Sequence, residues 1–62
     1  MFAQINEDSI RIIEMKGADE KEIVGWTKDE WVEDPETVVP AIANAIMLCY
    51  ENPEALLEQL GK

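Results

Sequence analysis

Fourteen consecutive residues without a charge, Thr37 to Tyr50, limit most strongly how this chain can fold. On a helix they would form two adjoining apolar stripes, interrupted only by Asn44. The first stripe consists of Val38, Ile42, Ala45, Ile46 and Cys49, and the second of Val39, Ala43, Met47 and Tyr50. A helix that is apolar most of the way round is buried on more than one side. We therefore expect a small sheet to cover one stripe, and the following helix or another subunit to cover the other.

The length of 62 residues predicts a single small domain, residues 1–62. A domain of this size buries only about 60% of the surface that its unfolded chain exposes, so its stability is marginal. Small folds usually gain stability from disulfides, a structural metal or a second subunit. The single cysteine, Cys49, excludes an intrachain disulfide. These limits favour a homo-oligomer.

The segment Asp34-Pro35-Glu36 carries the signals of a helix start, with an Asp cap and Pro at the first helical position. Pro40 conflicts with a helix that begins there, because its ring would meet the carbonyl of Glu36 and it has no amide to donate. With Thr37 as the cap this conflict disappears. We therefore expect an irregular turn at 34–37 and a long apolar helix over about 38–51.

Asn52-Pro53 ends that helix and begins a second one over about 53–60. Gly61 is the expected stop signal. Three leucines, Leu56, Leu57 and Leu60, would form the apolar stripe of this short helix. It is long enough to fold back on the first helix but too short to cover it completely.

The N-terminal half contains three short runs rich in Ile, Val and other strand formers, which predict strands at about 2–6, 9–15 and 22–28. The fold class is therefore α+β: an antiparallel sheet of two or three strands, then a long apolar helix and a short C-terminal helix. An all-α chain is the alternative. Ser9 and Asp19 could each cap a helix in this half, and Gly17 could end the first of them.

The residue types argue against catalysis. The chain has no histidine, one serine (Ser9) in an expected turn, and one cysteine (Cys49) on an apolar helix face. A nucleophile needs a neighbouring base, and a buried thiol has a raised pKa and is inert. No stretch matches a motif tied to a known activity. We expect no enzyme activity, no catalytic residues and no cofactor.

Calcium is bound by clustered carboxylate oxygens, so a run of acids is a candidate calcium site. The acids of this run are Asp29, Glu30, Glu33, Asp34 and Glu36. Its spacing does not match the EF-hand pattern, since Trp31 and Pro35 interrupt it and it lacks the central glycine. Zinc is a poorer fit still, with no histidine and one cysteine. We expect no metal site.

The formal net charge of -9 bears on the partners. It disfavours direct binding to nucleic acid and to anionic membrane surfaces, and favours a basic protein. The uncharged stretch is shorter than the roughly 20 residues of a membrane span, and no signal peptide opens the chain. We expect a cytoplasmic location.

Two tryptophans lie close together, and tryptophan is enriched where proteins bind one another. We expect Trp26 in the core and Trp31 at a contact surface. The predicted partner-binding residues are Asp29, Glu30, Trp31 and Glu33 from the acidic run, and Val39, Ala43, Met47 and Tyr50 from the second stripe.

Two functions fit these features. The first is a small acidic protein-interaction module, which acts as a homo-oligomer or an accessory and regulatory subunit through its apolar helix. The alternative is an acidic mimic of nucleic acid that occupies the basic site of a DNA- or RNA-binding protein, as small phage-encoded inhibitors can. The alternative requires the acids to lie together on one face.

Overall fold

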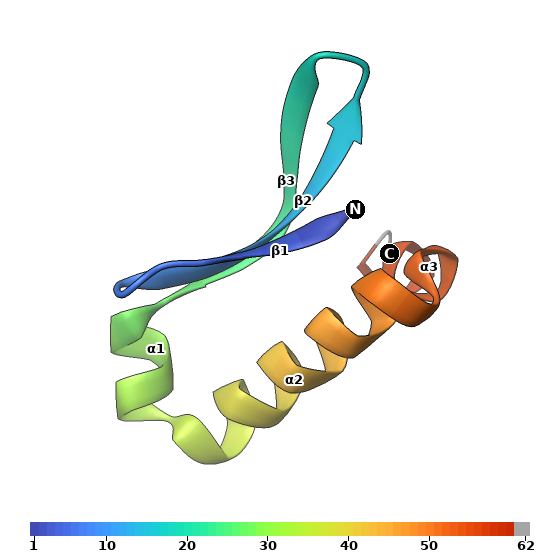
Figure 1. Ribbon diagram of the computed structural model, residues 1–62. Helices are drawn as coiled ribbons and strands as arrows, with labels where there is room; N and C mark the ends of the chain where they lie inside the picture. The colour runs from blue at the N-terminus through green and yellow to red at the C-terminus, as the bar shows by residue number, and fades with distance from the viewer. Residues whose placement is uncertain (61–62) are drawn as a thin grey trace.

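The structure is a computed structural model that describes residues 1–60. Its fold is α+β, with an N-terminal three-stranded antiparallel sheet followed by helices (Figure 1). The elements are β1 (Phe2–Ile5), β2 (Ser9–Lys16), β3 (Asp19–Thr27), α1 (Lys28–Glu33), α2 (Pro35–Glu51) and α3 (Pro53–Leu60). The α+β prediction is confirmed, and the all-α alternative is wrong. The predicted stop at Gly61 lies outside the described residues.

The strands are arranged in the order β1-β2-β3, with β2 in the centre. Ile12 on β2 lies opposite Ala3 on β1 and Val24 on β3. These three residues share the face that packs on the helices, since cross-strand partners point the same way. Ile13 points to the other face, where its partners are Phe2 and Glu22. The sheet therefore has apolar residues on both faces, although the helices lie on only one.

A β-bulge interrupts the pairing of β2 with β3, because Ile12 pairs with Val24 while Ile13 pairs with Glu22. The extra residue is Ile23, which packs with Val24 against the core. A bulge bends its strand and increases the local twist. Beyond it, the outer part of the β2–β3 hairpin turns away from the helices (Figure 1).

The tip of this hairpin is a two-residue turn, Gly17-Ala18, closed by the pair Lys16 and Asp19. Gly17 has φ of 66°, the left-handed conformation that glycine adopts without steric cost. The predicted loop over 16–21 was therefore too long, and β3 begins at Asp19 rather than at residue 22. The charged residues at 19–22 continue the ladder because a tight turn already sets the register.

The helices form a second layer under one face of the sheet (Figure 1). Helix α2 contacts β1 and β2, and α3 folds back to contact both α2 and β3. The residues at the centre of the core are Ile12, Ala45, Cys49 and Leu56. Asn52 links the two helices as predicted: its Oδ1 accepts a hydrogen bond from the amide of Ala55 at 3.3 Å.

Helix α1 was not expected, since the predicted strand ended at about residue 28 and the first predicted helix began at about residue 38. Thr27 and Glu30 have the Thr-x-x-Glu spacing of a capping box. The Glu30 carboxylate accepts hydrogen bonds from the amide of Thr27 at 3.3 Å and from its hydroxyl at 3.4 Å. This spacing is visible in the sequence and was the signal that could have predicted α1.

Helix α2 begins at Pro35 with Asp34 as its N-cap, so the predicted turn at 34–37 and the start at 38 are wrong. The first helical bond runs from the amide of Val38 to the carbonyl of Asp34, at 2.9 Å. Pro40 lies inside the helix. Both Pro40 and Glu36 are exposed, so the Glu36 carbonyl that lacks an amide partner is on the solvent side. A carbonyl open to solvent does not need an amide donor from the helix, so the helix continues through Pro40.

None of the helices in the described part of the chain is both long enough and apolar enough to cross a membrane.

Candidate functional site

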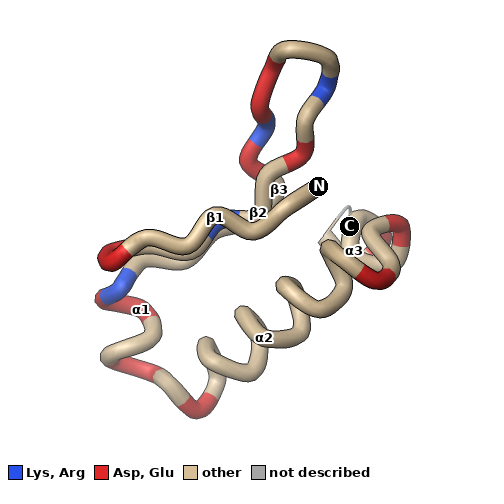
Figure 2. The backbone as a smooth tube through the Cα atoms, viewed as in Figure 1, with Lys and Arg blue, Asp and Glu red and all other residues tan. Residues whose placement is uncertain are grey.

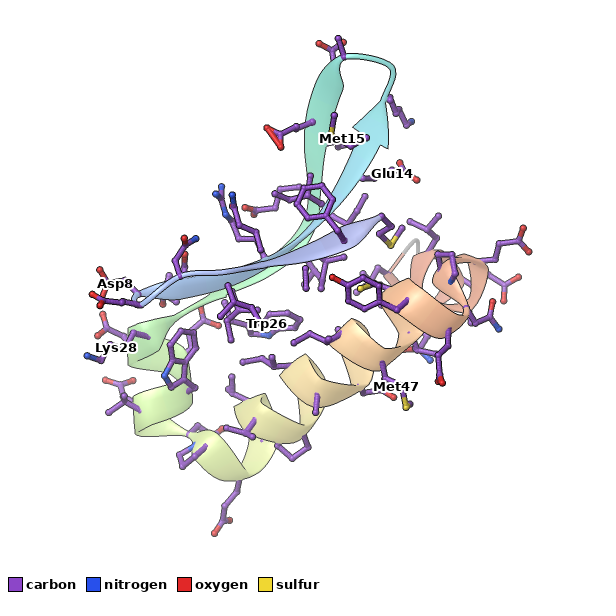
Figure 3. All side chains as sticks on the ribbon, viewed as in Figure 1. Asp8, Glu14, Met15, Trp26, Lys28 and Met47 are labelled. Atoms are coloured by element: carbon purple, nitrogen blue, oxygen red, sulfur yellow. The ribbon has the colours of Figure 1, made fainter. Side chains whose placement is uncertain are left out.

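The second apolar stripe of α2, made of Val39, Ala43, Met47 and Tyr50, lies in solvent; we call these four residues the outer row. The exposed fractions of Val39, Met47 and Tyr50 are 50%, 51% and 61%, and Ala43 is exposed as well. Met47 points away from the sheet (Figure 3). The opposite side of the helix is the covered one, through the buried residues Ile42, Ala45 and Cys49. The structure thus brings together four of the eight predicted partner-binding residues on one helix face.

Tyr50 ends the outer row beside the edge strand β1. Its phenol oxygen accepts a hydrogen bond from the backbone amide of Ala3 at 3.1 Å. That amide belongs to the side of β1 that does not pair with β2, since successive amides of an edge strand alternate in direction. The bond satisfies one donor of the sheet edge and fixes the tyrosine ring while most of the ring stays exposed.

Acidic residues cluster along the backbone at the end of the molecule where the β1–β2 turn, α1 and the start of α2 lie (Figure 2). A hydrogen bond from the amide of Lys28 to the carbonyl of Asp8, 2.7 Å long, joins the turn to α1. Asp8 and Lys28 accordingly lie at the same end (Figure 3). The exposed acids found here are Glu7, Asp8, Asp29, Glu30, Glu33, Asp34 and Glu36. We call this group the acidic end.

Part of the acidic end has a local structural role. Asp29 and Glu30 lie in the first turn of α1, and Glu36 in the first turn of α2. Negative charge there interacts favourably with the positive end of the helix dipole. Glu33, at the last position of α1, has no such role. The acids predicted as contact residues are therefore exposed, but Glu30 also stabilises its helix.

The two tryptophans differ in position. Trp26 packs against the core and points from β3 into the space between the sheet and α2 (Figure 3), which confirms its predicted place. Trp31, on α1, is half-buried. Because part of its indole is buried within the fold, Trp31 offers a smaller exposed fraction to a partner than Val39, Met47 or Tyr50 does.

Two bases on the sheet have acidic neighbours. Arg11 lies 3.7 Å from Glu22 and donates a hydrogen bond to the Gln4 side chain on the outer face of the sheet. Gly25 leaves room for it, because a Cβ at this position would come within 3.2 Å of the Arg11 Cγ. Lys16 lies 3.9 Å from Glu14. These pairings reduce the positive charge that the sheet offers to phosphate.

Cys49 is buried at 3% exposure, and its Sγ donates a hydrogen bond to the carbonyl of Ile46 at 3.1 Å. Burial raises the pKa of the Cys49 thiol above its ordinary value of 9.0, and the positive charge of the N-terminal amine opposes the shift. A thiol with a raised pKa is a poor nucleophile. The residue is a small apolar component of the core.

The raised pKa predicts how stability depends on pH. Well below pH 9.0 the thiol is neutral in both the folded and the unfolded chain, so its ionisation does not affect the free energy of unfolding. Above that pH the unfolded chain ionises first, and the free energy of unfolding falls until the folded thiol ionises too. We expect the urea midpoint to fall more between about pH 8 and pH 10 than that of Cys49→Ala. Equal slopes would show that Cys49 is not the group responsible.

A surface hollow of about 210 Å³ lies between β3 and α3, lined by Lys21, Glu22, Ile23, Leu57 and Leu60. Ligand pockets usually have roughly 300–1,000 Å³, so this one is small. Within residues 1–60, no three Cys, Asp or Glu side chains are placed to hold a metal ion together. The outer row and the acidic end remain the two surfaces that call for an explanation.

Comparisons with known proteins found no match among protein-family models, curated proteins or solved structures. The function is therefore argued from the two surfaces themselves.

Proposed function

We propose that this chain is a small protein-interaction module that binds through the outer row of α2, either in a homo-oligomer or as an accessory subunit of a larger protein. One observation carries the proposal: Val39, Met47 and Tyr50 are each at least half exposed on a helix with no charge from Thr37 to Tyr50. Burying such surface contributes about 25 cal/mol per Å². Contiguous exposed apolar surface commonly marks an interaction site.

Site-specific photo-crosslinking in the cells that produce the protein tests this proposal. A photoreactive residue at Met47 should form a discrete adduct, and the same residue at Met15 should not. The two side chains are similarly exposed, at 51% and 46%, but Met15 lies on the β2–β3 hairpin, far from the outer row (Figure 3). An adduct of twice the chain mass of 7.0 kDa identifies a homo-oligomer, and a heavier one an accessory subunit.

The adduct at Met47 should decrease at least about ten-fold when Val39 is replaced by Asp, because an unpaired charge is then buried in the contact. Ala18→Asp is the matched control, since it adds the same charge at the exposed hairpin tip. Identical adducts at Met47 and Met15, or no effect of Val39→Asp, would contradict the proposal.

The alternative function, an acidic mimic of nucleic acid, is favoured by the acidic end. Its seven acids are all exposed and lie near one base, Lys28. Carboxylates held on a folded surface can present negative charge to Arg and Lys sites as phosphates do. Under this alternative, the chain would displace DNA or RNA from a basic binding site without binding nucleic acid itself.

Displacement of labelled duplex DNA from a panel of basic DNA-binding proteins tests the alternative. Replacing Glu7 and Glu33 with Lys should weaken displacement about ten-fold or more, and raising the salt from about 50 to 200 mM should do the same. Glu54→Lys with Glu58→Lys on α3 changes the charge equally and should have little effect. Fluorescence anisotropy measures the displaced fraction. Displacement that is insensitive to salt would exclude mimicry.

A further inference from the structure

The outer row has a carboxylate in line with it at each end. Glu36 lies in the first turn of α2 and Glu51 at its last position. The steps from Glu36 through Pro40, Ala43 and Met47 to Glu51 are three or four residues each, so all five lie along one side of the helix. At about 1.5 Å per residue the two carboxylates are about 22 Å apart along the axis.

Glu51 is placed against the local electrostatic preference. The C-terminal end of a helix carries partial negative charge, which favours a base and disfavours an acid. The last turn of α2 has no base. Glu51 therefore does not stabilise its own helix, and no ion pair of its carboxylate is found among the described residues.

The charge around α2 disfavours a second copy as the occupant of the outer row. Residues 29–60 contain no Lys or Arg. Two α2 helices packed antiparallel would bring Glu36 of each copy near Glu51 of the other, and parallel packing would pair each acid with itself. Either arrangement places like charges together at both ends of the contact.

We propose that the occupant of the outer row is a helical segment of a different protein, apolar over about four turns and carrying Lys or Arg at both ends, about 22 Å apart. This inference rests on the proposed function and names the partner's chemistry. The apolar centre covers Val39, Ala43 and Met47, and the two basic ends meet Glu36 and Glu51. The binding mode is that of two amphipathic helices packed along their apolar faces.

Two synthetic helical peptides of about 22 residues test the inference. They share one apolar face and differ only in carrying Lys or Gln at both ends. Fluorescence anisotropy should give the Lys peptide a Kd at least about ten-fold lower at about 50 mM NaCl, and the advantage should shrink to less than about three-fold at about 500 mM. Equal Kd values for the two peptides at low salt would overturn the inference.

Charge neutralisation shows whether the two carboxylates are responsible. Glu36→Gln with Glu51→Gln should remove most of the preference for the Lys peptide. Asp19→Asn with Glu20→Gln at the hairpin tip changes the net charge equally and should retain it. An equal loss in both double variants would overturn the inference, because it would mean that overall charge alone attracts the peptide.

Met47→Asp separates this inference from the proposed function. It should abolish binding of both peptides without unfolding the chain, since Met47 is half exposed; circular dichroism checks the fold, and Val39→Asp is a second variant of the same kind. If Met47→Asp abolishes binding but the peptides bind equally, only the inference fails. If it changes neither Kd, the proposed function fails with it. Self-association tighter than binding of the Lys peptide, measured by sedimentation, would also overturn the inference.

Discussion

Replacing Ile12 with alanine should lower the free energy of unfolding by about 3 kcal/mol, within the range of roughly 2–5 kcal/mol for large-to-small core changes. Ile12 is fully buried at the centre of the middle strand, where it packs in one cluster with Ala45, Cys49 and Leu56. At about 0.05–0.15 kcal/mol per residue, a chain of 62 residues has only about 3–9 kcal/mol in total. The variant should therefore lose at least about a third of the total free energy of unfolding and its urea midpoint should fall accordingly.

Ile5→Ala is the matched control, because the same atoms are removed from a side chain that is 67% exposed on the edge strand. Its expected cost is within about 0.5 kcal/mol. Urea titrations followed by tryptophan fluorescence, to which Trp26 at the core contributes, measure both losses. Comparable losses at the two positions would contradict the core that the structure describes.

The C-terminal helices were predictable because their ends are marked by local chemistry. Asn52 and Pro53 end one helix and start the next by rules that involve only neighbouring residues. The start of α2 was predicted incorrectly because Pro40 was given too much weight. A missing amide is costly only where the freed carbonyl is shielded from water, and the burial of the Glu36 carbonyl depends on the tertiary fold.

The strands and their antiparallel arrangement were predicted from the β-branched runs, but the register of β2 with β3 was not. The bulge at Ile23 allows this residue and Val24 to face the core together, which strict alternation along a strand forbids. The charged segment 19–22 has low strand propensity and was assigned partly to a loop. Its place in the ladder follows from the turn at Gly17, whose geometry outweighs propensity over so short a distance.

The two candidate surfaces differ in how far the sequence predicts them. Helical periodicity alone separates the outer row from the buried stripe that contains Ile42 and Cys49. It does not say which of the two stripes is covered, since both are apolar. The acidic end includes Glu7 and Asp8, which are distant from α1 in sequence and lie beside it because Ser9 pairs with Thr27 and the amide of Lys28 bonds to the carbonyl of Asp8. No local pattern predicts that contact.

Leu56→Ala should destabilise the chain almost as much as Ile12→Ala, by about 2–4 kcal/mol. Leu56 is 2% exposed and belongs to the same core cluster as Ile12, whereas Leu60, one turn further along α3, is 41% exposed. Leu60→Ala removes the same atoms from the rim of that helix and should cost less than about 1 kcal/mol. Urea titration followed by far-UV circular dichroism measures both variants.

The difference between the two leucine variants decides whether α3 belongs to the core. Because Leu56 packs in one cluster with Ile12, the costs of replacing both should not be additive, with a coupling of about 0.5 kcal/mol or more in a double-mutant cycle. If the costs of Ile12→Ala and Leu56→Ala were additive, and Leu56→Ala and Leu60→Ala cost the same, α3 would contribute no buried residue to the core. Helix α2 would then be covered by the sheet alone, and the apolar surface left for a partner would extend beyond the outer row to the side of α2 that α3 occupies.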